Sequence, residues 1–284
     1  MTKRILMLLF IDVLALAAVG QAFAQVQSKD QRQIKSKNVL SAQVISMLVP
    51  QQCFSSGSGA TFLKICITNN GNVSWFESPA GKVHLQTREG YAVCSGAVEG
   101  PSSVIHGFDA NIAANGWGVS AVSQPNGVGT FPLIITRQSL DGVIQLKQTF
   151  TRNTAERGVD VKIDVKNMSL SALNQVFMSR YFDGDIDNSS TNAYDSTYGS
   201  VWARGSSSAL TLTSASSGIQ VIADVYDYAQ WNPFGTMSQY ARGCGQQEAY
   251  TWGVLHDFVG GLTLYFSTLN PGQTKTATVL YHRF

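Results

Sequence analysis

The fold is decided by a ten-residue stretch at positions 158–167, which reads Gly158-Val159-Asp160-Val161-Lys162-Ile163-Asp164-Val165-Lys166-Asn167. Its β-branched apolar residues occupy every second position and alternate with Asp and Lys. In an extended strand successive side chains point to opposite faces, so the pattern places an apolar row on one face and a charged row on the other. A helix would scatter the valines around its surface. The stretch therefore predicts a half-buried β-strand.

Turn signals separate other short apolar runs in the same way. Residues 62–68 and 73–76 enclose Asn69-Asn70-Gly71-Asn72. Asn-Gly between two such runs favours a tight hairpin, because both residues tolerate positive φ. Near the end of the chain, residues 262–266 and 276–281 enclose Asn270-Pro271-Gly272 and predict a similar turn. By these criteria the sequence contains about fourteen candidate strands.

These features predict an all-β protein with little helix, built as a large two-sheet β-sandwich of the supersandwich kind with about fourteen or more strands. Immunoglobulin-type sandwiches have roughly seven to nine strands, so a larger sandwich is expected. No Pro- or Gly-rich linker divides the chain. Residues 39–284 are therefore expected to form a single β-sandwich domain, after a polar and flexible leader at residues 25–38.

The first residues of the chain predict export. Lys3 and Arg4 precede an apolar run at residues 5–19, and the small-residue motif Ala22-Phe23-Ala24 follows. This order is typical of a secretory signal peptide. The run is shorter than the roughly 20 residues of a membrane-spanning helix. We expect residues 1–24 to be a signal peptide cleaved near Ala24, which leaves a secreted or periplasmic protein without a membrane span.

The composition narrows the class of partner. Charged residues make up only 13% of the chain, and the formal net charge is +2. This share is about half of the ~25% usual for soluble domains. Nucleic acid is not expected as a partner, because its phosphates require a basic face. A polar but uncharged partner such as a carbohydrate fits better, and the composition indicates no oligomeric state.

The four cysteines predict two disulfides. An even number in an exported chain allows three pairings, of which we favour Cys53–Cys66 and Cys94–Cys244. The first would close a short loop and the second would join distant parts of the chain. The spacings form no paired C-x-x-C motif, so no zinc site is indicated.

Three aspartates form a candidate calcium site. Asp183, Asp185 and Asp187 follow an apolar run at every second position, a spacing that supplies converging oxygens in calcium loops. The EF-hand pattern then fails, because Asn188 stands where Gly is needed and Tyr194 where Glu is needed. An irregular calcium loop is one interpretation. The alternatives are carboxylates that cap turns or share a solvent face, and a catalytic carboxylate pair that would cleave a glycosidic bond.

An aromatic segment at residues 226–235 is a candidate ligand-binding site. It carries Tyr228, Trp231 and Phe234 among amides, and such rings stack on sugars while amides bind hydroxyl groups. The alternative is that these rings cover the end of the core. The four histidines have no metal-ligand spacing, and no G-x-S-x-G motif is present. We therefore expect the histidines to be surface or packing residues.

Two longer stretches carry a resemblance to known proteins. Residues 65–100 contain Ile67-Thr68-Asn69-Asn70-Gly71-Asn72-Val73, and residues 177–202 contain Arg180-Tyr181-Phe182-Asp183-Gly184-Asp185-Ile186-Asp187. Both look like an uncharacterised group of bacterial secreted β-sandwich proteins, a resemblance that implies no activity. The strand succession at residues 146–182 is similar to the supersandwich of galactose mutarotase-like proteins in shape alone. The mutarotase pair of His and an acidic base has no clear counterpart here.

Three functions agree with these features. The first is a non-catalytic binding module for carbohydrate, with calcium near Asp183. The second is a carbohydrate-active enzyme of glycosidase or lyase type that uses carboxylates at residues 183–187. The third is a structural surface protein. A pocket with two facing carboxyl groups beside the aspartates would favour the enzyme, whereas its absence would favour the binding module.

Overall fold

The computed structural model describes residues 50–85, 88–96, 104–109, 114–189, 192–227, 255–256 and 258–283. All of them belong to one compact unit, Ile45–Phe284. They contain antiparallel strands and two 3-10 turns, η1 (Gly59–Thr61) and η2 (Ile186–Asn188). Among these residues no helix has the length and apolar character needed to cross a membrane. The prediction of an all-β chain with little helix is confirmed.

The strands form three sheets. In spatial order, the four-stranded sheet consists of β1 (Gln51–Ser56), β2 (Leu63–Thr68), β3 (Val73–Glu77) and β4 (Val83–Leu85). The six-stranded sheet consists of β16 (Gln220–Asp227), β18 (Phe258–Leu269), β12 (Leu173–Asp183), β5 (Arg88–Ser95), β6 (Val104–Asp109) and β7 (Ala114–Asn115). The nine-stranded sheet consists of β17 (Leu255–His256), β13 (Asn192–Thr197), β14 (Ser200–Arg204), β15 (Ala209–Ser214), β19 (Thr274–Arg283), β11 (Gly158–Asn167), β10 (Ile144–Asn153), β9 (Leu133–Gln138) and β8 (Ala121–Ser123).

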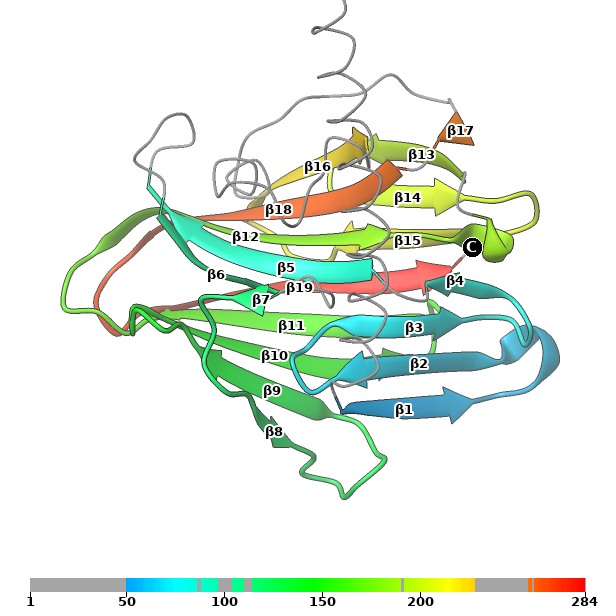
Figure 1. The fold of residues 1–284 in the computed structure, drawn as a ribbon, viewed down its shortest axis with the longest axis horizontal. Helices are drawn as coiled ribbons and strands as arrows, with labels where there is room; N and C mark the ends of the chain where they lie inside the picture. Colours follow the sequence, from blue (N-terminus) through cyan, green and yellow to red (C-terminus); the bar gives the residue numbers. More distant parts are fainter. Residues whose placement is uncertain are drawn as a thin grey trace, which may run out of the picture. The chain divides into compact units, whose positions relative to one another are not determined.

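The sheets pack as a sandwich around one core. Figure 1 shows the four-stranded and six-stranded sheets in front of the nine-stranded sheet, and a single hydrophobic cluster contains side chains from all three. The sandwich prediction is confirmed, but hydrogen bonding divides the front layer into two sheets rather than one. The division arises because β5 is already paired with β12 and β6, which leaves no free edge for β4.

The strand that suggested the fold lies at the centre of the nine-stranded sheet. β11 pairs with β10 and β19, and its four alternate apolar side chains are fully buried: Val159, Val161, Ile163 and Val165. The predicted hairpin around Gly71 is also present as β2 and β3. Gly71 has a φ of +94°, and a side chain there would collide with the amide of Gln148. The turn therefore requires glycine for both conformation and space.

The second predicted turn is present, but it does not close a hairpin. Asn270-Pro271-Gly272 does lie between two strands, β18 and β19, but these belong to different sheets. The chain crosses from the six-stranded to the nine-stranded sheet at this turn. Turn residues indicate where a strand ends, whereas burial of the two apolar faces decides where the next strand pairs.

A buried ion pair connects the three sheets. Arg180 on β12 and Glu89 on β5 are fully buried, with 2.7 Å between Nε and Oε1. The guanidinium also donates to the carbonyl of Gly71 at 2.8 Å and to the amide oxygen of Gln148 on β10. The hydroxyl of Tyr281 on β19 donates to Glu89 at 2.5 Å. Burial opposes the charge on Arg180, but the attraction of Glu89 outweighs it and raises the pKa of Arg180 above its ordinary value.

Candidate functional site

Asp187, one of the three predicted calcium ligands, accepts hydrogen bonds from a serine loop. It lies in η2 with a φ of +57°, and its carboxylate accepts from the backbone N–H of Ser207 at 2.9 Å and the hydroxyl of Ser208 at 2.7 Å. The hydroxyls of Ser206 and Ser207 add bonds of 3.1 to 3.2 Å. The ammonium of Lys82 lies 3.6 Å away. Partial burial raises the pKa of Asp187, but these hydrogen bonds outweigh it and hold that pKa well below its ordinary value.

The other two aspartates lie close by in the chain. Asp183 is the last residue of β12 and is buried, and Asp185 immediately precedes η2. Within the described ranges, no group of three or more His, Cys, Asp or Glu side chains is arranged to hold a metal ion. The contacts of Asp187 are those of a turn-stabilising carboxylate. Calcium binding here stays a prediction, and thermal melting with calcium and with a chelator would test it, because a ligand of the folded state raises the midpoint.

The predicted aromatic site and one predicted disulfide cannot be placed. Tyr228, Trp231, Phe234 and Cys244 all lie outside the described residues. Cys94 is itself disulfide-bonded, but its predicted pairing with Cys244 stays a prediction. The same holds for the signal peptide at residues 1–24 and the leader at residues 25–38.

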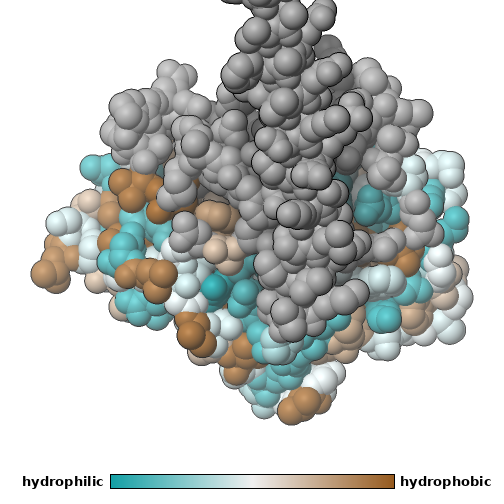
Figure 2. Space-filling model, in the orientation of Figure 1, coloured by the Kyte–Doolittle hydropathy of each residue, from teal (hydrophilic) through white to brown (hydrophobic). Residues whose placement is uncertain are grey.

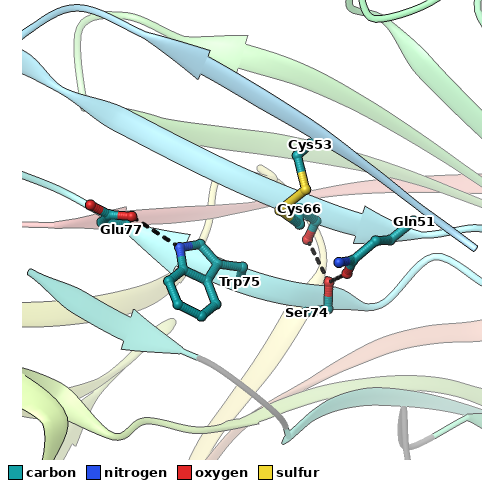
Figure 3. Close-up of a disulfide and its surroundings, with 6 residues drawn as sticks. All are labelled: Gln51, Cys53, Cys66, Ser74, Trp75 and Glu77. Carbon is teal, nitrogen blue, oxygen red and sulfur yellow. Dashed lines mark hydrogen bonds between the residues drawn. A yellow bond between two sulfur atoms is a disulfide. The ribbon is translucent and has the colours of Figure 1, made fainter. Parts of the chain in front are cut away.

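The predicted Cys53–Cys66 disulfide is confirmed. The two residues lie directly opposite each other on β1 and β2, with Cα atoms 4.0 Å apart. Figure 3 shows Trp75 of β3 near this bond, with its indole N–H donating to Glu77 at 3.2 Å. The ammonium of Lys64 lies 5.3 Å from the centre of the Trp75 ring. The disulfide thus fastens the edge strand β1 to the rest of the four-stranded sheet.

A cavity opens beside this disulfide and is the candidate binding site. Its volume is about 300 Å³. It is formed by β1, β2, the segment between β8 and β9, and β10, and its lining residues are Cys53, Phe54, Ser55, Ser56, Leu63, Ile65, Gly129, Phe131 and Arg152. The rings of Phe54 and Phe131 stack with their centres 4.1 Å apart and their planes 20° apart. None of the three predicted aspartates lines this cavity.

The lining combines an apolar wall with a few polar groups. Phe54, Leu63 and Ile65 are buried and belong to the core, whereas Ser55 and Arg152 are exposed. A serine hydroxyl both donates and accepts hydrogen bonds, and a guanidinium offers several donors in one plane. Small-ligand sites commonly have this mixture, with volumes of roughly 300 Å³ upward. The cavity can therefore hold a small molecule that has one apolar face and a polar edge.

The lining contains no group for acid–base catalysis. Hydrolysis of a glycosidic bond ordinarily requires two carboxyl groups about 5 to 9.5 Å apart, and the nine described lining residues include no Asp or Glu. Sequence reasoning missed this cavity because its residues come from four separate segments. The only local signal was the expected Cys53–Cys66 loop, which encloses Ser55 and Ser56.

Comparison with known proteins finds likeness in fold alone. No family model matches the chain, and no curated protein matches its sequence. A bacterial glucoamylase in complex with acarbose has a TM-score of 0.53 and 8% identity, covering 83% of this chain and 33% of that chain. A candidate aldose 1-epimerase from Escherichia coli K12 has a TM-score of 0.47 and 10% identity, covering 83% and 99%.

A third solved structure, heparan sulfate lyase HepC from Pedobacter heparinus, has a TM-score of 0.43 and 8% identity, covering 81% of this chain and 36% of that chain. The described chain therefore spans about a third of the length of the glucoamylase that it resembles. At 8% identity the likeness to the glucoamylase concerns the sandwich, because unrelated activities share such folds. The comparison therefore shows likeness at the level of the fold, as the sequence led us to expect, and nothing finer.

Proposed function

We propose that this protein is an exported carbohydrate-binding module, and that the cavity beside the Cys53–Cys66 disulfide holds the sugar without catalysing its conversion. The observation that carries the proposal is the stacked pair Phe54 and Phe131 in a cavity that Ser56 and Arg152 also line. A sugar ring has an apolar C–H face and a hydroxyl edge, which match these two kinds of lining. The ring would lie against Phe131, and its hydroxyls would bind Ser56, whose side chain lies on the same face of β1 as Phe54.

Two further observations support the proposal. The protein shares its fold with a glucoamylase whose structure contains acarbose. The chain is also poor in charged residues. On the face drawn in Figure 2, the coloured apolar side chains form separate small patches among polar ones. Export is supported by the Cys53–Cys66 disulfide, since such bonds persist in oxidising compartments. The predicted aromatic residues Tyr228, Trp231 and Phe234 would supply a second sugar contact.

A glycan array followed by calorimetry on the full chain tests this proposal. We expect Phe131→Ala and Arg152→Ala to weaken binding about tenfold or more, since a lost anchor commonly costs over 1 kcal/mol. Arg152 is exposed, whereas Phe131 packs partly against the core, so the urea unfolding midpoint of each variant is measured beside its binding. Arg204→Ala is the matched control, because Arg204 is an exposed arginine on β14 outside the cavity.

Two outcomes would contradict the proposal. One is a glycan array on which no saccharide binds. The other is saccharide binding that both cavity variants retain at full strength. Binding that depends instead on carboxylates at residues 183–187, with release of a cleaved product, would favour the carbohydrate-active enzyme.

A further inference from the structure

Three side chains at one end of the sandwich form a continuous hydrogen-bonded chain. The hydroxyl of Ser95 lies 2.8 Å from Nε2 of His106. Nδ1 of the same ring lies 2.7 Å from Oδ2 of Asp141. The order is hydroxyl, imidazole, carboxylate, with each ring nitrogen of the histidine facing one partner. This is the arrangement by which a histidine activates a serine nucleophile.

The fold brings these residues together from three segments. Ser95 is the last residue of β5, and His106 lies on the neighbouring strand β6. The pairing of β5 with β6 shifts register so that Val93 faces Gly107 and Cys94 faces Ile105. His106 is therefore the extra residue of a β-bulge, a feature that redirects a side chain within a sheet. Asp141 lies in the turn between β9 and β10 of the other layer.

The turn fixes the orientation of the carboxylate. Oδ1 of Asp141 accepts from the hydroxyl of Ser139 at 2.5 Å and from the backbone N–H of Val143 at 3.0 Å. Oδ2 is thereby directed at His106. When Nδ1 donates to Asp141, the unprotonated Nε2 accepts from Ser95, which is the tautomer that a general base requires.

The charge of Asp141 suits that role. Partial burial raises its pKa, but the hydrogen bonds from Ser139 and His106 outweigh this and lower the pKa below its ordinary value. The carboxylate is therefore ionised at neutral pH and would stabilise an imidazolium on His106.

The surroundings indicate the class of substrate. Val104 lies directly opposite Ser95 across the strand pair and is 52% exposed. Leu140, next to Asp141, is 72% exposed. Ser95 itself retains 7% of its surface. Val104 places apolar surface beside the hydroxyl, and Leu140 adds exposed apolar surface next to the carboxylate. The hydrocarbon part of an acyl group would pack against the surface beside the hydroxyl.

We propose that Ser95 is the nucleophile, His106 the general base and Asp141 the orienting carboxylate of an acyl-transfer centre that acts on carboxylic esters of short acyl chains. This inference goes beyond the proposed sugar binding and does not depend on it. Ser95 Oγ would bond to the ester carbonyl carbon while its proton moves to His106 Nε2. The carbon–oxygen bond to the alcohol then breaks, and His106 returns the proton to that oxygen. Water repeats the sequence, releases the carboxylic acid and restores Ser95.

A fluorophosphonate probe tests the centre on the wild-type full chain. Ser95 Oγ should displace fluoride from phosphorus and remain phosphonylated, which intact mass and peptide mapping detect. The same protein should hydrolyse p-nitrophenyl butyrate. We expect Ser95→Ala to abolish the adduct and His106→Gln to slow labelling about 10²- to 10⁴-fold. Asp141→Asn should slow labelling while keeping Ser95 as the modified residue.

Ser179→Ala is the matched control, because Ser179 is also a buried sheet serine but its hydroxyl contacts Thr263. This variant should label like the wild type. The proposal is overturned if the folded wild type forms no adduct at Ser95, or if Ser95→Ala is labelled equally. In that case the three residues serve only to fasten the β9–β10 turn to β6, and their substitutions would lower stability alone.

Discussion

At the scale of single residues, the Arg180–Glu89 pair places two opposite charges in the core. Taking two charges out of water is costly, and the pair is tolerated because each group is bonded to the other and to further partners. Removing one partner leaves the other charge buried without compensation. The pair therefore affects stability mainly through the large loss expected when only one of its two charges is removed.

We expect Glu89→Ala to destabilise the protein by about 3 to 5 kcal/mol in urea unfolding. The double variant Glu89→Leu with Arg180→Met should recover most of that loss, because no charge then remains buried. Lys162→Ala is the control, since Lys162 is exposed at the surface and its pair with Asp164 is worth less than about 1 kcal/mol. Equal destabilisation by the single and double variants would contradict the argument.

Asp187 gives a second prediction, which concerns pH. Its pKa is lowered in the folded protein from an ordinary value of 3.8. A carboxyl group with a lower pKa in the folded state stabilises that state above the unfolded pKa, and this contribution is lost as the pH falls through the folded pKa. We expect wild-type stability to fall steadily below about pH 4.

Asp187→Asn should cost about 1 to 3 kcal/mol at pH 7 and should flatten the dependence below about pH 4. Urea midpoints at neutral and acidic pH measure both effects. Identical pH profiles for the variant and the wild type would show that Asp187 is not responsible.

At the scale of elements, β1 is an edge strand that a disulfide fastens to its neighbour. Among the described strands it pairs with β2 alone, and edge strands are open to fraying and to wrong pairing. We expect the double variant Cys53→Ala with Cys66→Ala to lose about 2 to 4 kcal/mol of stability. Amide hydrogen exchange should rise first in β1, while β10 and β11 stay protected. Unchanged exchange in β1 would mean that packing alone holds the strand.

The same elements show what the sequence could predict. The alternation at residues 158–167 identified β11 correctly, because both the burial and the charge pattern of that strand are local. The Asn-Gly signal identified the β2–β3 turn for the same reason. The turn between β18 and β19 was also predicted, but not that its strands lie in different sheets, because the pairing partner of each strand depends on contacts far along the chain.

Most of the candidate sites could not be predicted from local sequence patterns, because each is assembled from segments that lie far apart in the chain. The cavity residues come from four segments, and Ser95, His106 and Asp141 are separated by 11 and 35 residues. A β-bulge in one layer and a turn in the other bring Ser95, His106 and Asp141 together. No sequence motif predicts this contact. The Cys53–Cys66 pair was predictable because four cysteines in a chain expected to be exported allow only three pairings, and these two lie 13 residues apart.

At the scale of the whole described unit, the three sheets share one hydrophobic cluster. We therefore expect them to unfold together. Incorporation of 5-fluorotryptophan provides probes in two sheets, Trp75 on β3 and Trp202 on β14. Their fluorine resonances should disappear at the same urea concentration. Separate midpoints would show that the four-stranded sheet unfolds independently.

The hydrogen bonds of Arg180 also bear on how the chain reaches its native state. Its partners lie 32, 91, 101 and 109 residues away in sequence. No local hairpin can satisfy this guanidinium, so it stays hydrated until strands from all three sheets have arrived. A compact intermediate with a slipped strand would have to bury a bare cation, which is costly. We therefore expect Arg180 to raise the free energy of compact intermediates in which one of these strands is misplaced, and so to favour the native arrangement of the three sheets.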